Sequence, residues 1–248
     1  MKKLIKKIAD ADKDYGLIDE NDRIAVGISG GKDSSLLLIA LEIYRRKSRK
    51  NFSIVGIHIN MGFGEDDISP LKDIFDSYQI EVHYVPSHLS EILEKNIKKD
   101  LVQCSLCSKL KKGAVIQEAL KYGCNKVAFA HHADDAIETL FLNAMYGSRL
   151  ATFDPKMYMS ETKVHFIRPF VYVKESEIIL HTTQLNIPRI KSGCPVDGLT
   201  KRQTIKDILN KIYEDIPDAH DNFIRMLSNQ KQLHLWKRLL DSDDSHKI

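Results

Sequence analysis

The chain has 248 residues, of which 43% are hydrophobic, and its formal net charge is +3, from 37 basic and 34 acidic residues. This composition excludes a mostly disordered chain and supplies enough apolar side chains for a full core. No charged-then-apolar leader precedes Lys6 and no run of about 18 apolar residues occurs, so we expect a soluble, cytoplasmic protein with no membrane partner.

Predicted strands and helices alternate over the first 146 residues. The apolar run Arg23–Ile28 leads into paired glycines, and a helical pattern follows from Ser34. In chain order the expected elements are a helix over 2–12, the strand 23–28, a helix from 34, a strand over 52–59, a helix over 70–78, a strand over 81–85, helices over 87–97 and 106–122, a strand over 126–130 and a helix over 133–146. This alternation predicts an α/β fold, a doubly wound parallel sheet with helices on both faces.

The pattern changes after Gly147. Short strands are expected over 156–159 and 164–170, then a helix over 175–185 and, after a turn-rich stretch, amphipathic helices from about 200 to 240. We therefore expect a small C-terminal helical extension. The predicted division is an N-terminal helix over 1–20, a central domain with a cysteine-bearing insertion over 21–185, and a C-terminal helical region with the third cysteine over 186–248.

A glycine-rich loop, Ser29-Gly30-Gly31-Lys32-Asp33-Ser34, joins the first predicted strand to the next helix. The backbone N–H groups of such a loop and the amino terminus of the helix converge on one point, where anions bind readily. Lys32 adds charge, Ser29 and Ser34 add hydroxyl donors, and Asp33 suits a Mg²⁺ ion that bridges phosphates. The loop does not match the Walker A pattern. It is predicted to bind phosphates in another way.

A second polar motif, His131-His132-Ala133-Asp134-Asp135, follows the predicted strand 126–130. Because parallel strands end at the same edge of a sheet, we expect it beside the glycine loop. Asp134 and Asp135 could hold Mg²⁺ or orient an acceptor. They could also cap the next helix, with Glu138 completing a capping box from Asp135, and the two roles are compatible.

Three cysteines form a candidate metal site. Cys104 and Cys107 have Cys-x-x-Cys spacing at the start of a predicted helix, and Cys194 stands in a glycine- and proline-containing turn. Three thiolates suit a [4Fe–4S] cluster with one open iron, whereas structural zinc usually takes four protein ligands. The cysteine pair could instead carry a persulfide and resolve it as a disulfide. Cys124 is predicted to be a small buried residue.

Basic side chains gather over residues 2–7, 45–50 and 109–112. Such clusters could contact phosphates, or they could be solvated helix faces.

Together these motifs resemble the PP-loop ATPase superfamily, which has the adenine nucleotide α-hydrolase-like fold. The glycine loop matches the family's pyrophosphate loop at all six positions, and residues 131–139 resemble the second motif of its tRNA-modifying members. On residues 104–113, 138–147 and 155–170 the resemblance narrows to the tRNA 2-thiocytidine synthetase group. It spans about residues 23–194. The chain departs from the group at Lys191, where a cysteine usually precedes the third ligand.

The resemblance implies that ATP is cleaved between its α and β phosphates, so that an acceptor oxygen becomes adenylated. The implied cofactors are ATP, Mg²⁺ and a [4Fe–4S] cluster, and the implied partners are tRNA and a sulfur donor; a homodimer is left open. The implied catalytic residues are Asp33, Asp134, Asp135 and Lys111. The implied nucleotide-binding residues are Ser29, Gly30, Gly31, Lys32, Asp33, Ser34, His58, Asn60 and His131. The implied cluster ligands are Cys104, Cys107 and Cys194.

The expected activity is thiolation at C2 of a pyrimidine in tRNA, with cytidine 32 as the base and 2-thiocytidine as the product. An anticodon-loop base is already unpaired, so it can be turned into a pocket at low cost. The alternatives are a 2-thiouridine-forming sulfurtransferase and a lysidine-synthase-like ligase. A tRNA-binding or iron–sulfur carrier protein without turnover is a further alternative, against which the intact Asp33, Asp134 and Asp135 argue.

Overall fold

The computed structural model describes residues 1–60, 62, 67–87, 89, 104–188, 190, 201–229, 231 and 234–235. The chain forms two compact units, residues 1–207 and 208–248. The domain boundaries predicted at residues 20 and 185 stay predictions. None of the helices in the described part of the chain combines the length and apolar composition that a membrane span needs.

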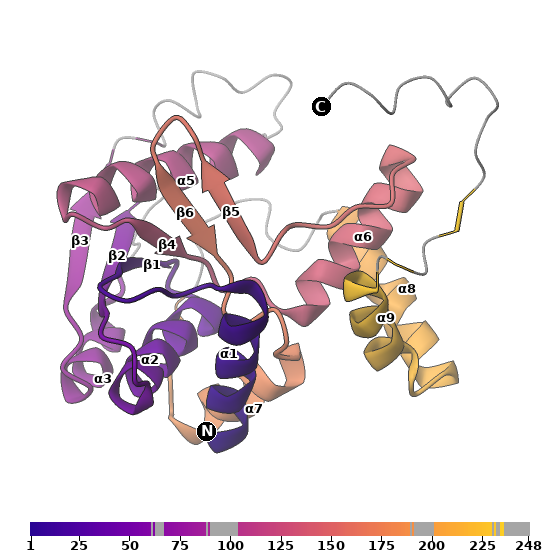
Figure 1. The fold of residues 1–248 in the computed structure, drawn as a ribbon, viewed down its shortest axis with the longest axis horizontal. Helices are drawn as coiled ribbons and strands as arrows, with labels where there is room; N and C mark the ends of the chain where they lie inside the picture. Colours follow the sequence, from indigo (N-terminus) through magenta and orange to yellow (C-terminus); the bar gives the residue numbers. More distant parts are fainter. Residues whose placement is uncertain are drawn as a thin grey trace. The chain divides into compact units, whose positions relative to one another are not determined.

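A six-stranded sheet lies at the centre of the first unit, in the order β3-β2-β1-β4-β6-β5 (Figure 1). Its strands are β1 (Arg23–Ile28), β2 (Ser53–Asn60), β3 (Val82–Pro86), β4 (Lys126–Ala128), β5 (Lys156–Met159) and β6 (Val164–Ile167). All neighbours pair in parallel except β5 and β6. The predicted parallel sheet is confirmed, with one antiparallel edge strand. The four residues between β5 and β6 are too few for the crossover that a parallel pair requires.

The helices surround this sheet in chain order. They are α1 (Lys2–Tyr15), α2 (Lys32–Lys47), α3 (Lys72–Ser77, after a 3₁₀ turn Ser69–Leu71), α5 (Cys104–Lys121), α6 (Ala133–Gly147), α7 (Glu175–Gln184), α8 (Lys201–Asp215) and α9 (Ala219–Ser228). The predicted elements are found within a few residues of these bounds. The helix expected over 87–97 lies almost wholly outside the described residues.

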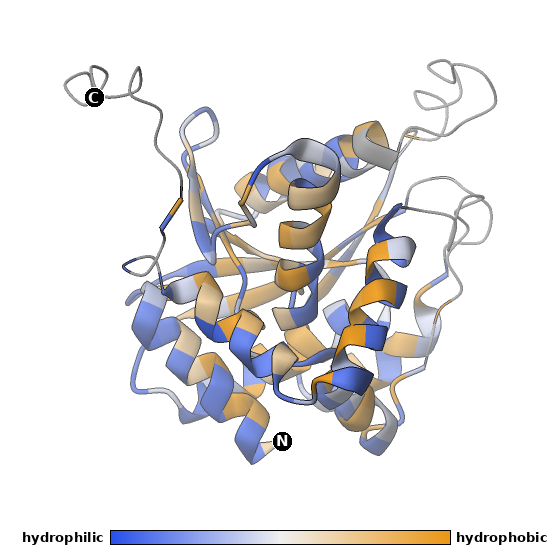
Figure 2. Ribbon diagram, turned by 90° about the vertical axis from the view of Figure 1, so that its right-hand side faces the viewer, coloured by the Kyte–Doolittle hydropathy of each residue, from blue (hydrophilic) through white to orange (hydrophobic). Residues whose placement is uncertain are grey.

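Alternation along β1 divides the core into two layers. Ile24, Val26 and Ile28 point into one apolar cluster with α1, α2 and α7, whereas Ala25 belongs to the cluster on the other face, with α5. Successive side chains of a strand point to opposite faces, so a strand covered on both sides is apolar throughout. Figure 2 shows hydrophobic residues on the strands and on the helix sides that face the sheet. Cys124 is buried in the α5 layer, as predicted.

The order of the strands creates a switch point at β1. From β1 the chain passes outward through β2 to β3, then returns to pair β4 on the opposite side of β1. The connections that leave the carboxyl ends of β1 and β4 therefore diverge and leave a crevice between them. The glycine loop follows β1 and the His131–Asp135 motif follows β4, so the fold brings both motifs to this crevice.

Within the second unit, the end of α8 packs on α9. The ring of Tyr213 lies 5.3 Å from that of His220 and 6.4 Å from that of Phe223, measured between centroids.

Candidate active site

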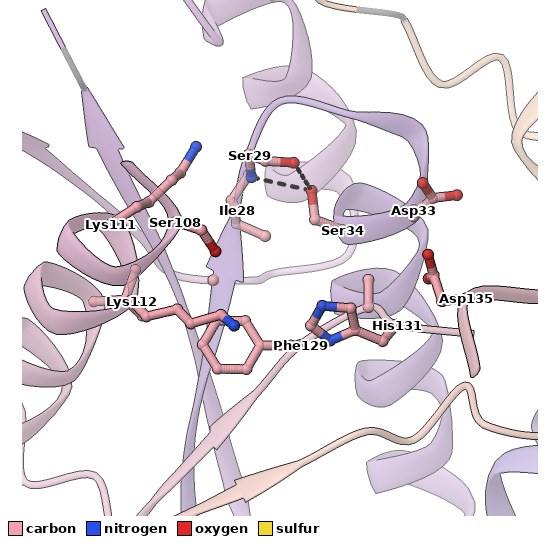
Figure 3. A pocket seen from close by; sticks show the side chains of 13 residues that line it. Ile28, Ser29, Asp33, Ser34, Ser108, Lys111, Lys112, Phe129, His131 and Asp135 are labelled. Carbon is pink, nitrogen blue, oxygen red and sulfur yellow. Dashed lines mark hydrogen bonds between the residues drawn. The ribbon is translucent and has the colours of Figure 1, made fainter. Parts of the chain in front are cut away.

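A cavity of about 280 Å³ lies at the β1–β4 crevice (Figure 3). Six of its lining residues were predicted site residues: Ser29, Asp33, Ser34, Lys111, His131 and Asp135. The others are Gly27, Ile28, Ser108, Lys112, Val115, Phe129 and Ala130. The structure thus brings residues of the glycine loop, α5 and the second motif to one cavity.

The glycine loop is held in a conformation that only glycine accepts easily. Gly30 has a φ of +79°, and a Cβ there would lie 3.2 Å from Ile190 and 3.3 Å from Ile68. The backbone N–H of Ser29 donates to Oγ of Ser34, 3.1 Å away. The loop therefore closes onto the first turn of α2, which forms one wall of the cavity through Asp33 and Ser34.

Lys32 faces away from the cavity. Its Nζ lies 3.0 Å from Oδ1 of Asp33 and 3.2 Å from Oε1 of Glu175. Burial alone lowers the pKa of Lys32, but the two carboxylates outweigh burial and raise it. Oε2 of Glu175 accepts from Lys206, 2.5 Å away, on α8. Burial raises the pKa of Glu175, and the hydrogen bond from Lys206 and the charge of Lys32 bring the net pKa below its usual value.

The two aspartates of the second motif have different surroundings. Oδ2 of Asp135 accepts the backbone N–H of His132, 3.0 Å away, and Oδ1 lies 2.9 Å from Nη1 of Arg202. Oδ2 of Asp134 instead accepts the backbone N–H of Glu175 at 2.7 Å, at the start of α7. Of the two, only Asp135 lines the cavity.

The capping box of α6 lies three residues earlier than expected. The N-cap is His132 and the third helical residue is Asp135, so the alternative that paired Asp135 with Glu138 is wrong in register. The reason is that α6 already begins at Ala133. Glu138 is buried, and burial together with the charge of Asp135 raises its pKa, although Arg202 opposes the shift.

Two adjacent histidines titrate in opposite directions. Burial lowers the pKa of His131 to about 4, and the positive charges of Arg168, Lys112 and Arg202 add to this effect while Asp135 opposes it. His131 is therefore neutral at pH 7. Burial also lowers the pKa of His132, but its hydrogen bond to Asp134 and the charge of Asp135 outweigh burial and raise the net pKa.

Helix α5 supplies the basic wall of the cavity. Lys111 and Lys112 stand on the side opposite Asp33 and Asp135 (Figure 3). Lys112 is half-buried, and burial, followed by the positive charges of Arg168 and Arg202, lowers its pKa. The cavity thus has one basic and one acidic side, which suits an anion that carries a metal ion.

Other predicted site residues lie apart from the cavity lining. His58 is buried with Nδ1 3.0 Å from the carbonyl oxygen of Ile28. Oδ1 of Asn60 accepts the backbone N–H of Gly62 at 2.8 Å. Both residues end β2, one strand away from the β1–β4 crevice, and Gly30, Gly31 and Lys32 are also absent from the lining. Their nucleotide-binding roles stay predictions.

The predicted cluster site is described only in part. Cys107 is half-buried on α5. It stands one helical turn before Lys111 and next to Ser108, both of which line the cavity. The Cys104 side chain and all of Cys194 lie outside the described residues. Among the described side chains, no group of three His, Cys, Asp or Glu residues is arranged to hold a metal ion.

The structure adds site residues that the sequence motifs did not indicate. Phe129 and Lys112 line the cavity, and Glu175, Arg202 and Lys206 contact its loop or its carboxylates. Lys112 had only appeared in a basic cluster. The four-residue spacing of Arg202 and Lys206, which places both on one face of α8, is the only sequence signal for that pair.

The basic cluster at the end of α2 is structural. Glu42 is buried and accepts from Arg45 at 2.8 Å and from Arg46 at 2.6 Å, while Lys50 lies 2.6 Å from the buried Asp12. A helix of 16 residues places this cluster about 24 Å from the glycine loop. The α5 cluster, by contrast, reaches the cavity.

Comparison with known proteins agrees with this geometry. The model of the PP-loop domain family matches residues 1–210. The chain is 35% identical to the tRNA-cytidine(32) 2-sulfurtransferase of Pelobacter propionicus over 241 residues, which are 96% of this chain and 90% of the relative. It is also 35% identical to the protein of that name from Geobacter metallireducens, over 96% of this chain and 94% of the relative.

The chain therefore belongs to the PP-loop family, and within it to the family of the tRNA-cytidine(32) 2-sulfurtransferases. The resemblance inferred from the motifs is confirmed. A U34-tRNA thiolase from Methanococcus maripaludis, solved with its [4Fe–4S] cluster, has the same fold: the TM-score is 0.74 at 21% identity, over 94% of this chain and 79% of the thiolase.

Proposed function

We propose that the protein is an ATP-dependent tRNA sulfurtransferase that converts cytidine 32 to 2-thiocytidine. The observation that carries the proposal is the cavity at the β1–β4 crevice, where a pyrophosphate-type loop meets two carboxylates and two lysines. The names of its relatives support tRNA as the substrate and cytidine 32 as the base.

The loop residues fit a triphosphate. Gly30 leaves room that a Cβ would fill, and the amino terminus of α2 favours negative charge. Ser29 and Ser34 supply hydroxyl groups to the cavity, and Lys32 can exchange its two carboxylates for phosphate oxygens. The loop would thus hold the β and γ phosphates, which leave together as pyrophosphate.

Asp33 and Asp135 are the residues that would hold Mg²⁺. Their carboxylates lie on the same side of the cavity (Figure 3). Each carboxylate oxygen has two lone pairs, so an oxygen that already accepts a hydrogen bond can also bind a metal ion. Asp134, which binds the start of α7, would act by fixing the second motif rather than by contact with ATP.

The reaction needs an attack of the C2 carbonyl oxygen of the base on the α-phosphorus of ATP. The new oxygen–phosphorus bond forms as the α–β bond breaks. Lys111 and Lys112 stand where they can stabilise the negative charge on the α-phosphate, and the neutral His131 does not compete for that anion. Sulfide then attacks C2, the carbon–oxygen bond breaks, and AMP leaves.

Cys104, Cys107 and Cys194 would hold the cluster. The position of Cys107, one turn from Lys111, fits a cluster at the edge of the cavity. When bound, the cluster supplies the sulfide that replaces oxygen at C2. The presence of a [4Fe–4S] cluster in the related thiolase supports this assignment. A separate sulfur donor would renew the sulfide.

The test uses protein purified without oxygen, with iron and sulfide measured. It is mixed with ATP, Mg²⁺, a sulfide source and tRNA from a strain that lacks 2-thiocytidine. We expect 2-thiocytidine at position 32 and one AMP per thiolated base, with Asp33→Asn as the inactive control. AMP release without 2-thiocytidine would overturn the substrate, and the same nucleoside measurement would reveal 2-thiouridine or lysidine instead. No AMP release would overturn the whole proposal.

A further inference from the structure

Helix α8 places a guanidinium group on the second motif. Nη1 of Arg202 lies 2.9 Å from Oδ1 of Asp135 and 3.3 Å from Oε2 of Glu138, and Nη2 lies 3.4 Å from Oγ1 of Thr139. The side chain of Arg202 is partly exposed, whereas that of Glu138 is buried. All four residues belong to the first unit. One side chain from α8 therefore joins three residues of α6.

This contact completes the restraint on Asp135. Its Oδ2 is already held by the backbone N–H of His132 at 3.0 Å and lies 3.4 Å from Nε2 of the same residue. Oδ1 faces Arg202. With each oxygen bound by a different group, the carboxylate has one orientation in the cavity. Without Arg202, only Oδ2 would be held, and the carboxylate could rotate about the bond to Cβ.

Arg202 also separates two like charges. Asp135 and Glu138 are three residues apart on the same face of α6, and Glu138 has 7% of its side chain exposed. Two carboxylates so close repel each other when no cation lies between them. The planar guanidinium satisfies both at once, which a lysine ammonium does with less geometric control. An arginine at this position thus fixes direction as well as charge.

Lys206, one turn further along α8, makes the matching contact on the other side. It donates to Glu175 at 2.5 Å, and Glu175 also accepts from Lys32 and donates its backbone N–H to Asp134. The two cations of α8 therefore reach both the glycine loop and the second motif. This second contact anchors α8, so that Arg202 approaches Asp135 from a fixed direction.

We infer that Arg202 is a positioning residue for the adenylation step, which holds the Asp135 carboxylate in the orientation that the reaction uses. The inference rests on the proposed function, because adenylation is the step in which Asp135 would contact metal and nucleotide. A residue that only anchored α8 would affect stability. A positioning residue affects turnover at saturating ATP.

The experiment measures AMP release by the full-length protein with tRNA and ATP, for wild type, Arg202→Ala, Arg202→Lys and Thr204→Ala. Thr204 is exposed on the same turn of α8 and serves as the matched control. Misorientation of a reacting group costs up to about 100-fold in rate. We expect Arg202→Ala to lower kcat by about 10- to 100-fold with little change in the KM for ATP. Millimolar guanidinium should restore part of kcat, and Arg202→Lys should fall between the two.

The outcomes separate the inference from the proposed function. No AMP release by the wild type would overturn both. An active wild type with Arg202→Ala equal to Thr204→Ala would overturn the inference alone. So would a loss that appears only in KM, or one that follows a lower melting temperature and does not respond to guanidinium. If Arg202→Ala does not fold, Arg202→Lys decides: unchanged kcat in that folded variant would also overturn the inference.

Discussion

Lys112 is a half-buried cation whose neighbours repel its charge. Burial and the charges of Arg168 and Arg202 lower its pKa, so the folded protein gains little from keeping it charged. Its value must come from a ligand. Residues kept for function at the expense of stability are common at active sites.

We predict that Lys112→Gln leaves the melting temperature unchanged or raises it while weakening ATP binding by about tenfold or more, as expected when a charged hydrogen bond is lost. Calorimetric titration with ATP and a thermal melt measure the two effects. Lys109→Gln, on an exposed position of the same helix, is the control and should change neither. Equal ATP affinity in the Lys112 variant would show that this wall does not bind the nucleotide.

His131 predicts a pH dependence of stability. Its pKa is about 4 in the folded protein, against an ordinary value of 6.5. Above pH 6.5 the imidazole is neutral in both the folded and the unfolded chain. Between pH 6.5 and 4 the unfolded chain binds a proton that the folded chain does not, so the free energy of unfolding falls as the pH falls.

We therefore expect His131→Gln to lose less stability than the wild type between pH 7 and pH 5 when both are measured by denaturant unfolding without Mg²⁺. Parallel pH profiles for the two proteins would contradict the lowered pKa. An NMR titration of the imidazole in the folded wild type gives the same quantity directly.

At the scale of the element, the turn from β1 into α2 depends on Gly30. Its φ of +79° costs an L-residue about 1–2 kcal/mol. A Cβ would also press on Ile190 and Ile68. We predict that Gly30→Ala lowers the free energy of unfolding by at least that amount and weakens ATP binding more than Gly113→Ala. A Cβ at Gly113 meets no neighbouring atom within 4 Å. Equal ATP affinities in the two variants would contradict a strict conformational role for Gly30.

The elements themselves were largely predictable from the sequence. Apolar runs such as Arg23–Ile28 and the helical pattern after Ser34 depend on local periodicity, and the structure contains both. The glycine loop was identifiable because its conformation limits the choice of residue. Likewise, the placement of His131 and Asp135 at the cavity followed from where β4 ends.

Contacts between distant segments were not predictable in this way. Arg202 and Asp135 are 67 residues apart, and no local pattern specifies which acid an arginine on α8 will contact. The capping register of α6 was missed because it depends on where the helix starts, and the antiparallel β5 because it depends on the short turn before β6. Such features follow from tertiary packing, which overrides local preference.

At the scale of the whole molecule, the two edges of the sheet have different tasks. The carboxyl edge holds the cavity, whereas the amino edge holds a buried ion pair. Lys126, at the start of β4, has 2% of its side chain exposed and lies 2.6 Å from both Asp22 and Asp19. Asp22 is equally buried, with 3% exposed.

We predict that Lys126→Ala lowers the free energy of unfolding by about 3–5 kcal/mol, because it leaves the charge of Asp22 buried without its cation. The exposed pair of Lys121 with Glu118 offers a control, and Lys121→Ala should cost less than about 1 kcal/mol. Adenylation by the folded Lys126→Ala variant should be normal at low temperature, since the substitution is at the opposite edge of the sheet. A loss of activity without a loss of stability would contradict this division.

The pairing of Lys32 with Asp33 and Glu175 also bears on how the protein tells one phosphate from another. A nucleic acid offers its phosphates singly, each with one negative charge, and one such charge gains little by displacing two carboxylates from the same ammonium. A triphosphate with its metal ion brings several charges together, and the metal can take over Asp33. The glycine loop therefore rejects the backbone of the very RNA that the protein modifies, and remains available to the nucleotide while the RNA is bound.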